Sequence, residues 1–327
     1  MKKIGITMGD PAGIGPEISV KALASNEEYL NHSIIFGSTS IIDYYVNLLK
    51  LNLNINSITH PAEFKSGHIN VLNVKDLSID NIEIGKVSPI AGEATYKYIE
   101  TAIQYSLNGD IGPVVTAPLN KEALHLAGYN YAGHTEIFAT LTNTKEYTMM
   151  LWSEKISVVH VSTHVSLREA CDLVKKDRII ECITLANDAL SKLGVKNPKI
   201  AVAGLNPHSG ESGLFGTEEI DEIIPAVNQM KEKGYNVEGP IPPDTVFLQT
   251  LQGKYDTVVA MYHDQGHIPL KLLAFDNGVN VTLGLPIIRT SVDHGTAFDI
   301  AGKGIAKEDS MLSAIKLAIH LGNENKN

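Results

Sequence analysis

The chain has 327 residues, of which 43% are hydrophobic and 20% are charged, a composition typical of a soluble globular protein. This length is too great for one ordinary core and suits two α/β domains or one large domain. The formal net charge of -10 argues against nucleic acid as a partner, because proteins that bind polyanions normally carry a basic surface.

Cysteine usage and the lack of long apolar runs indicate the compartment. Cys171 and Cys182 do not have the spacing of a disulfide framework or a metal pair, and two thiols in so long a chain suit a reducing cytosol. The first residues contain no apolar run long enough for a signal peptide, and no stretch approaches the ~20 apolar residues of a membrane helix. We therefore expect a cytoplasmic protein without a membrane partner.

Short apolar runs that end in Gly, Pro or Asn recur along the chain and predict strands at residues 4–8, 33–36, 114–116, 156–161, 200–203 and 257–261. A periodicity of 3.6 residues predicts helices between several of them, at residues 91–107, 177–193 and 225–233. Strands that alternate with helices indicate a parallel sheet covered on both faces. Ligands bind at the carboxyl ends of the strands in such sheets.

Two glycine-containing segments follow this pattern in the first half of the chain. The segment from Gly9 to Glu17 forms a rigid turn after the first strand, but its glycine spacing differs from the GxGxxG fingerprint, so a Rossmann site is only weakly indicated. Gly133, His134 and Thr135 suit close approach to a ligand, while Glu136 equally fits the third position of a helix capped at Gly133. A plain turn or cap and a ligand contact both remain open for each segment.

Three histidines, His164, His208 and His263, each follow a separate predicted strand. Any one of them alone is more often a hydrogen-bonded core residue than a ligand. Three imidazoles at the same edge of a parallel sheet predict an open divalent-metal site, with zinc or cobalt the best match and magnesium or manganese as alternatives. His160 and His267 are expected in the core or behind the ligands, and Asp264 as the group that orients an imidazole.

Two further segments carry candidate binding residues. Lys271 and Arg289 lie within apolar stretches, where an unpaired charge is unfavourable, so with Asn280 they predict a local anion site in an otherwise acidic chain. The alternative is two solvated surface cations. The loop from Asp293 to Gly304 is rich in glycine and small residues, which allows backbone amides to approach a ligand, although a plain surface loop has the same composition.

Long blocks of the chain resemble the 4-hydroxythreonine-4-phosphate dehydrogenase family, among them ITMGDPAGIGPEI, TAPLNKEALHLAG, GHTE, STH, GLNPHSGE, PPDTVF, MYHDQGH, GVNVTLGLP and IRTSVDHGTAFDIAGKG. Within the family, the blocks TAPLNKEALHLAG, PPDTVFLQ, GHIPLKLL and HGTAFDIA are most similar to the branch acting on D-threonate or D-erythronate 4-phosphate. The segment HGTAFDIAGKG is also similar to the adenosine-binding loop of isopropylmalate and isocitrate dehydrogenases.

The resemblance implies a fold and a division of the chain. It implies two α/β/α domains with a cleft between them, as in the isocitrate and isopropylmalate dehydrogenases. The expected division places residues 1–120 and 275–327 in a terminal, cofactor-side domain and residues 121–274 in a central domain with the metal and the dimer interface. It also implies a homodimer with the site at the interface, so that a metal ligand can come from the partner subunit.

The resemblance further implies roles for matching positions. The metal ligands are His164, His208 and His263. The substrate contacts are His134, Thr135, Lys271, Asn280 and Arg289. The cofactor contacts are His294, Gly295, Thr296, Ala297 and Asp299. Lys271 and Asp244 are the candidate proton carriers.

The implied reaction oxidises the 3-hydroxyl of a 4-phosphorylated hydroxy acid with NAD, or alternatively NADP, and one divalent metal per subunit, and then releases carbon dioxide. D-threonate or D-erythronate 4-phosphate would yield dihydroxyacetone phosphate. The alternative substrate is 4-hydroxy-L-threonine 4-phosphate, in pyridoxal phosphate biosynthesis. Two rival classes are a zinc lyase of the class II aldolase type, which needs no NAD, and a non-catalytic sensor of phosphorylated sugar acids.

Overall fold

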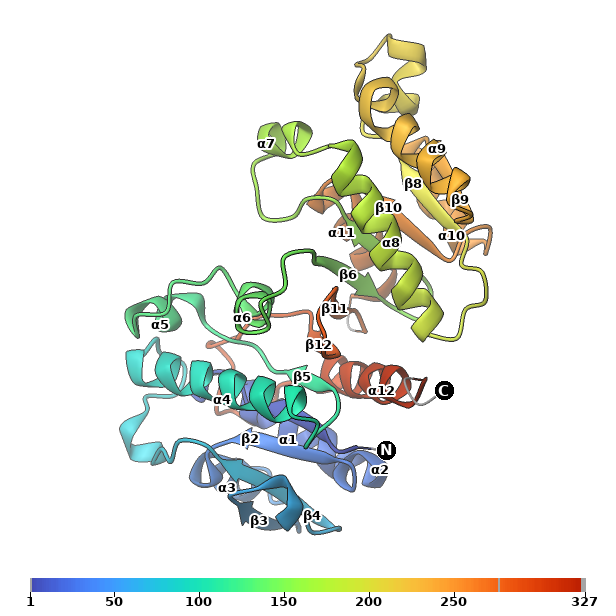
Figure 1. Ribbon diagram of the computed structural model, residues 1–327. Helices are drawn as coiled ribbons and strands as arrows, with labels where there is room; N and C mark the ends of the chain where they lie inside the picture. Colours follow the sequence, from blue (N-terminus) through green and yellow to red (C-terminus); the bar gives the residue numbers. More distant parts are fainter. Residues whose placement is uncertain (1, 276, 325–327) are drawn as a thin grey trace. The chain divides into compact units, whose positions relative to one another are not determined.

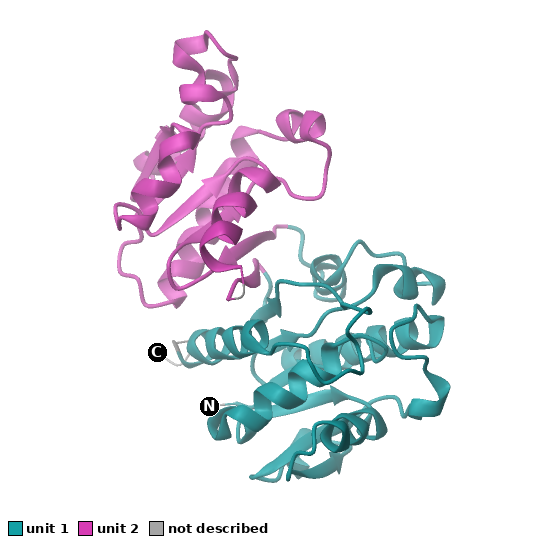
Figure 2. Ribbon diagram, turned by 180° about the vertical axis from the view of Figure 1, so that it is seen from behind, with its two compact units in different colours: residues 1–145, 285–327 teal, residues 146–284 magenta. Residues whose placement is uncertain are grey.

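The computed structural model describes residues 2–275 and 277–324. It divides into two compact units (Figure 2). Unit 1 comprises Met1–Lys145 and Leu285–Asn327, and unit 2 comprises Glu146–Gly284. The division expected from the sequence also joins the two ends of the chain in one domain, with boundaries after residues 120 and 274. The structure has its boundaries farther along the chain because α5 and α6 pack on α4 of unit 1, and β11 pairs with β6 of unit 2.

Unit 1 contains a parallel sheet in the order β3-β4-β2-β1-β5-β12 (Figure 1). Its strands are β1 (Ile4–Thr7), β2 (Ser33–Gly37), β3 (Asn54–Ile58), β4 (His68–Asn73), β5 (Val114–Thr116) and β12 (Arg289–Val292). The central strands are buried along their whole length, as expected for a parallel sheet covered on both faces.

Two groups of helices pack on this sheet. One group consists of α1 (Gly15–Ser25), α2 (Glu27–Leu30), α3 (Thr39–Leu48) and α12 (Asp309–Glu324), in which α1 contacts the other three. The other consists of α4 (Pro89–Leu107), which contacts β1, β2 and β5, with α5 (Lys121–Leu126) and α6 (His134–Leu141) against it. Short 3₁₀ turns lie at η1 (Pro61–Glu63) and η2 (Ile79–Asn81).

Unit 2 contains a mixed sheet in the order β11-β6-β7-β10-β8-β9. Its strands are β6 (Thr148–Trp152), β7 (Ser157–His160), β8 (Ile200–Ala203), β9 (Val237–Ile241), β10 (Thr257–Ala260) and β11 (Val279–Leu283). The strands β7, β10, β8 and β9 are parallel, while β6 is antiparallel to both β7 and β11. In the β6–β11 pair Thr148 lies opposite Leu283, so unit 2 starts and ends on neighbouring strands.

Helices also cover the sheet of unit 2. One layer holds α8 (Lys176–Lys192) and α9 (Ile224–Glu232), and the other holds α10 (Pro243–Leu251) and α11 (His263–Ala274). The short helix α7 (Leu167–Asp172) follows β7, and the turns η3 (Pro207–Gly213) and η4 (Glu219–Ile223) follow β8. The core contains Leu151, Val158, Ala201, Val258 and Leu270.

The α/β class predicted from the alternation of apolar runs is confirmed. The runs at residues 114–116 and 200–203 form β5 and β8 at the predicted residues, and the other four match β1, β2, β7 and β10 to within one residue at either end. The three predicted helices correspond to α4, α8 and α9. Among the described residues, no helix combines the length and the apolar character needed to cross a bilayer.

A close approach between α4 and α5 gives a test of this packing. A Cβ at Gly92 of α4 would overlap the backbone carbonyl of Ala123 in α5. We expect Gly92→Ala to lower the free energy of unfolding by about 1–3 kcal/mol, because the backbone has to move apart. Gly295→Ala is the control, since a Cβ there meets no atom within 4 Å. Urea unfolding of both variants measures the effect, and equal stability of the two would contradict it.

Candidate functional site

The three candidate metal-ligating histidines follow neighbouring parallel strands of unit 2. His164 follows β7, His263 follows β10 and His208 follows β8, and these strands are adjacent in the order β7-β10-β8. Bonds beyond the strands continue this alignment. The amide of Val161 donates to the carbonyl of Ala260 at 2.9 Å, and the hydroxyl of Ser162 donates to the carbonyl of Met261 at 3.1 Å. The ends of these strands therefore meet at one edge of the sheet, as the sequence pattern predicts.

His164 and His263 are close to each other. Their ring centroids are 5.8 Å apart. Nδ1 of His263 is 2.7 Å from Oδ1 of Asp264, which leaves Nε2 as the ring nitrogen free of that carboxylate. On its other side His263 stacks on His267, at 3.6 Å between centroids and 13° between planes. A carboxylate on one ring nitrogen and a stacked neighbour are what orients an imidazole that binds a metal.

His160 lies behind this pair, in the core of unit 2. Its ring is fully buried at the end of β7, 4.7 Å from the ring of His267. Nδ1 is 3.4 Å from the carbonyl of Met149, and Nε2 is buried without a hydrogen-bond partner. Burial, together with the neighbouring histidines, lowers the pKa of His160 to about 3, so its ring is neutral. The core position expected from the sequence is where the structure places it.

His208 lies on an unusual turn after β8. Residues His208, Ser209, Gly210, Glu211 and Ser212 all have positive φ, between 44° and 80°, so the turn is left-handed. For residues other than glycine this conformation costs roughly 1–2 kcal/mol each. Such a turn persists only where surrounding contacts hold it, and it is frequently found at functional sites. His208 itself is exposed.

The side chain of Gln265 links the segment that leads into the His208 turn to the helix that carries His263. The amide of Gln265 in α11 donates to the carbonyl of Gly204 at 2.8 Å, and its carbonyl accepts from the amide of Met261 at 2.7 Å. Gly204 is the first residue after β8, and Gln265 is buried. The segments after β8 and β10 are therefore held together at the edge of the sheet.

The donor set fits a divalent metal in its chemistry, since imidazole nitrogen is a preferred ligand of zinc and cobalt. Within one chain the structure brings two of the three rings, His164 and His263, close together. Over residues 2–275 and 277–324, no group of three or more His, Cys, Asp or Glu side chains is arranged to hold a metal. One chain therefore supplies an oriented pair of imidazoles, with His208 on its own turn.

The remaining candidates of unit 2 lie on three different elements. Lys271 lies on α11, half-buried, with Nζ 5.4 Å from the centroid of the Phe275 ring. Asn280 lies on β11, where its Nδ2 is 2.9 Å from Sδ of Met149 and its Oδ1 is buried without a hydrogen-bond partner. Asp244 is exposed in the first turn of α10.

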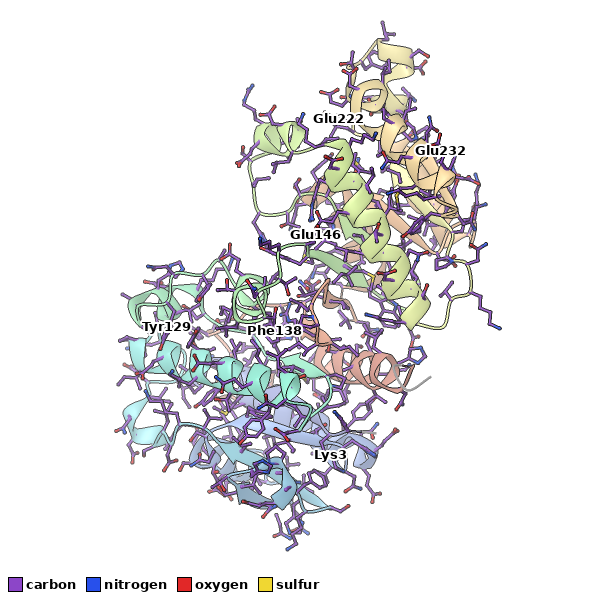
Figure 3. All side chains as sticks on the ribbon, viewed as in Figure 1. Lys3, Tyr129, Phe138, Glu146, Glu222 and Glu232 are labelled. Carbon is purple, nitrogen blue, oxygen red and sulfur yellow. The ribbon has the colours of Figure 1, made fainter. Side chains whose placement is uncertain are left out.

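Unit 1 holds a buried cation, Arg289, at the start of β12. Only 2% of the residue is exposed, and burial lowers the pKa of its guanidinium to about 9. Nε and Nη2 donate to Oγ1 of Thr116 on β5 at 3.2 and 2.8 Å. Phe138 of α6, labelled in Figure 3, lies with its ring centroid 5.6 Å from the guanidinium carbon. This burial rules out the alternative of a solvated surface cation for Arg289.

His134 is electrostatically coupled to Arg289. It is the first residue of α6, after Gly133, and its Nε2 is buried without a hydrogen-bond partner. Burial and the positive charge of Arg289 lower the pKa of His134 well below its usual range. The ring is therefore neutral and can present one N–H beside a fixed positive charge. Thr135 follows it in the first turn, where helix amides favour an anion.

The start of α6 also has the predicted cap. Gly133 is the residue before the helix, and Glu136 occupies its third position. The carboxylate of Glu136 accepts from the amide of Ala132 at 2.5 Å. The cap and a ligand role of His134 are therefore compatible.

The loop proposed for the cofactor packs on the glycine-containing turn after β1. The carbonyl of Thr296 accepts from the amide of Ile14 at 3.0 Å, and Thr296 is buried. Ala297 has a left-handed φ of 43°. His294, Gly295 and Asp299 are exposed, so a ligand could reach them. Thr296 and Ala297 thus shape the loop, and its exposed residues are those accessible to a cofactor.

Several buried polar residues near these groups escaped the sequence-based selection. Thr116 holds Arg289, and Gln265 bridges two strand ends. Asp10 is fully buried in the turn after β1, where burial raises the pKa of its carboxyl to about 6. Glu219 is a buried carboxylate behind the His208 turn. The positions of Thr116 and Asp10 at or just after strand ends carried a signal, whereas the roles of Gln265 and Glu219 depend on tertiary burial.

Comparisons with known proteins agree along almost the whole chain. The family model described as pyridoxal phosphate biosynthetic protein PdxA matches residues 29–318. D-threonate 4-phosphate dehydrogenase of Salmonella typhimurium is 50% identical over 325 residues, covering 98% of this chain and 99% of that protein. D-threonate 4-phosphate dehydrogenase of Pectobacterium atrosepticum is 49% identical over 326 residues, with coverage of 98% and 99%.

A solved structure is equally similar. The crystal structure of 4-hydroxythreonine-4-phosphate dehydrogenase from Klebsiella pneumoniae is 50% identical in sequence and superposes with a TM-score of 0.89. It covers 98% of this chain and 100% of that one. The similarity therefore extends to both units.

The neutral state of His134 gives a pH test. An unfolded histidine takes up a proton near pH 6.5, whereas the folded ring does so only at lower pH, so stability is lost as the pH falls below about 6.5. We expect His134→Gln to reduce this slope by up to about 1.4 kcal/mol per pH unit. Urea unfolding at pH 8, 6.5 and 5.5 measures the slopes, and the same slope in both proteins would show that the folded ring is protonated normally.

Proposed function

The chain belongs to the family of the pyridoxal phosphate biosynthetic protein PdxA, and on that premise we propose that it oxidises D-threonate 4-phosphate at the 3-hydroxyl and releases carbon dioxide, with dihydroxyacetone phosphate as product. Membership of a family whose relatives are named dehydrogenases makes it an oxidoreductase that acts on a CH–OH group. The proposed substrate rests on the 50% identity, over nearly the whole chain, to D-threonate 4-phosphate dehydrogenase of Salmonella typhimurium. D-erythronate 4-phosphate has the same groups and is the second candidate of this class.

A different substrate is favoured by one specific observation. The Klebsiella pneumoniae protein, also 50% identical, bears the name 4-hydroxythreonine-4-phosphate dehydrogenase. Its substrate differs from D-threonate 4-phosphate at C2, where an amine replaces the hydroxyl, and in stereochemistry. The reacting C3 hydroxyl, the carboxylate and the phosphate are common to both. The two candidates are therefore separated by kinetics and not by the type of chemistry.

NAD, when bound, supplies the hydride acceptor for C3, and a divalent metal supplies a Lewis acid for the C3 oxygen and for the carbonyl that forms there. Zinc or cobalt matches the imidazole donors best. NADP is the alternative coenzyme. The exposed residues His294, Gly295 and Asp299 of the 294–299 loop are the proposed coenzyme contacts.

The chain's own residues would bind and orient the substrate. Arg289 offers a buried positive charge whose orientation is fixed by Thr116. His134, neutral, would donate an N–H without adding charge, and Thr135 would add a hydroxyl at the start of α6. Asn280 and Lys271 of unit 2 are the other proposed contacts. Each of these groups can recognise a phosphate or carboxylate.

A proton must leave the C3 hydroxyl on oxidation, and another must reach C2 once carbon dioxide has left. Lys271 is the first candidate for these transfers, because it is half-buried in α11, the helix that begins at His263. Asp244 is the second candidate, at the exposed start of α10. An amine and a carboxylate are both among the side-chain groups that transfer protons in enzymes.

The proposed metal ligands are His164, His208 and His263. A zinc site that performs catalysis uses three protein ligands and keeps a position for substrate or water. One chain brings the rings of His164 and His263 to 5.8 Å, so a complete set would draw on His208 of the partner subunit. This proposal requires a homodimer with the metal site at its interface.

Large exposed apolar side chains on unit 2 support such a dimer. Leu272 is 82% exposed, Leu214 74% and Phe275 73%. Leu214 directly follows the turn that carries His208, and the other two lie on or next to α11, which carries His263. Large apolar side chains exposed close in sequence to the proposed ligands are candidates for burial in a protein interface. The surface near the proposed ligands is therefore the surface proposed to be covered.

Two other classes are less well supported. A class II aldolase-type lyase would cleave a carbon–carbon bond without NAD, and a sensor would bind a phosphorylated sugar acid without turnover. Membership of a dehydrogenase family disfavours both.

The substrate assignment is tested by NADH absorbance. With NAD and cobalt or zinc, we expect kcat/KM to be highest for D-threonate 4-phosphate among the three phosphorylated acids. We expect His208→Ala to lower turnover by more than about 100-fold, because even groups behind a metal ligand are worth 10- to 100-fold. A higher kcat/KM with 4-hydroxy-L-threonine 4-phosphate would overturn the proposed substrate assignment. Full turnover by His208→Ala would show that His208 is not part of the site.

The dimer is tested by a charge on the apolar surface. We expect Leu272→Glu to convert a dimer into a monomer at micromolar concentration, because a carboxylate is poorly tolerated in an apolar interface. Ile305→Glu is the matched control, since Ile305 is 61% exposed but lies in unit 1. Light scattering after size-exclusion chromatography gives the masses. If Leu272→Glu stays dimeric, the interface lies elsewhere.

A further inference from the structure

The left-handed turn from His208 to Ser212 needs an explanation, because four of its five residues are not glycine. Backbone hydrogen bonds link it to the residues on either side. The amide of Ser209 donates to the carbonyl of Asn206 at 3.1 Å, and the amide of Phe215 donates to the carbonyl of Gly210 at 3.2 Å. A conformation that L-residues disfavour requires contacts from outside the turn.

Glu219 supplies such contacts. It is 2% exposed and begins η4, a single turn of π-helix that leads into α9. Oε1 accepts from the backbone amides of Leu205 and Asn206, each at 2.7 Å. Oε2 accepts from Nδ2 of Asn206 at 2.9 Å. One buried carboxylate thus fixes the two residues through which the chain passes from β8 into the turn.

The same carboxylate also packs against the turn itself. A Cβ at Gly210 would lie 2.8 Å from Oε2 of Glu219, so the turn can approach the carboxylate this closely only with glycine at its centre. Asn206 is held a second time, by Oε2 of Glu218, which accepts from Nδ2 at 2.7 Å. Hydrogen bonds to an ionised carboxylate are stronger than those between neutral groups. Glu219 therefore restrains the turn in two ways, through hydrogen bonds to the preceding residues Leu205 and Asn206 and through close packing against Gly210.

We propose that Glu219 is a positioning residue, which holds the left-handed turn so that the imidazole of His208 is presented to the divalent metal. The proposal rests on the proposed function, in which His208 is a metal ligand. Glu219 acts through the backbone of Leu205 and Asn206 and touches neither metal nor substrate. Its removal would let the turn relax toward ordinary backbone angles and move His208 from its place.

A carboxylate is needed here and an amide is a poor substitute. Three N–H donors converge on Glu219, from Leu205 and from both amide groups of Asn206. The NH₂ group of a glutamine would place a donor against Nδ2 of Asn206 and would remove the negative charge. Glu219→Gln therefore changes the hydrogen bonding while preserving shape and volume.

The test measures metal binding by the full-length protein without substrate. The apoprotein is titrated with Co²⁺, whose absorbance in the visible range reports its ligands. We expect Glu219→Gln to weaken Co²⁺ binding by about 10-fold, in the range found for groups that orient metal ligands. The matched control is Glu222→Gln. Glu222, labelled in Figure 3, lies on the same π-helical turn and accepts a hydrogen bond from the backbone amide of Lys176 at 2.7 Å. The substitution Glu222→Gln therefore alters a comparable carboxylate–amide bond away from the His208 turn.

The results decide as follows. Weaker Co²⁺ binding in Glu219→Gln, with Glu222→Gln within about twofold of the unmodified protein, supports the proposal. Equal Co²⁺ affinity in Glu219→Gln and the unmodified protein overturns it, as does an equal loss in both variants. If Glu219→Gln does not fold, as judged by thermal unfolding in EDTA, Glu219→Asp replaces it under the same criteria, because it keeps the charge but withdraws it by one methylene.

The variant His208→Ala distinguishes the positioning role proposed for Glu219 from the metal-ligand role proposed for His208. If His208→Ala binds Co²⁺ as tightly as the unmodified protein, His208 is not a ligand and the proposed metal site is wrong. If His208→Ala loses affinity while Glu219→Gln keeps it, the ligand assignment stands and only the positioning role of Glu219 is overturned.

Discussion

The parallel pairing of β7, β10 and β8 is the constraint on which the chemistry of unit 2 depends. The ladder brings three chain segments to one edge of the sheet, and bonds such as that from Ser162 to Met261 continue the alignment into the loops. Gln265 then ties the segment after β8 to α11. The imidazoles of His164 and His263 meet because the strands beneath them are in register.

The two units differ in the ionisable groups that they bury. Unit 1 buries a positive charge, Arg289, and keeps the neighbouring His134 neutral, so that the proposed anionic substrate would meet one fixed cation in a chain of net charge -10. Unit 2 gathers imidazoles instead, with His160 kept neutral by burial behind them. In both units burial keeps a histidine neutral, because burial favours the uncharged form of an ionisable group.

Much of this could be predicted from the sequence, and what could not has a physical reason. Apolar runs predicted six of the strands, β1, β2, β5, β7, β8 and β10, and the histidines after three of them predicted the edge where a ligand would bind. The edge strands β3 and β9 lacked this signal, because β3 is polar and half-exposed and β9 contains a Gly-Pro pair. Gln265 and Glu219 became visible only with tertiary structure, since a polar residue gains its role from the donors and acceptors that surround it. The left-handed turn at His208 is likewise a product of packing, as nothing in Ser209, Glu211 or Ser212 favours it.

The pairing of β6 with β11 bears on how such a chain could have arisen. Thr148 lies opposite Leu283, so the two ends of unit 2 leave it side by side from hydrogen-bonded strands. A segment with adjacent ends can be inserted into a loop of a host domain without disturbing the host's own sheet. Unit 2 has the form of such an insertion, and all three candidate metal-ligating histidines lie within it. The ancestry of the two units could then be traced independently.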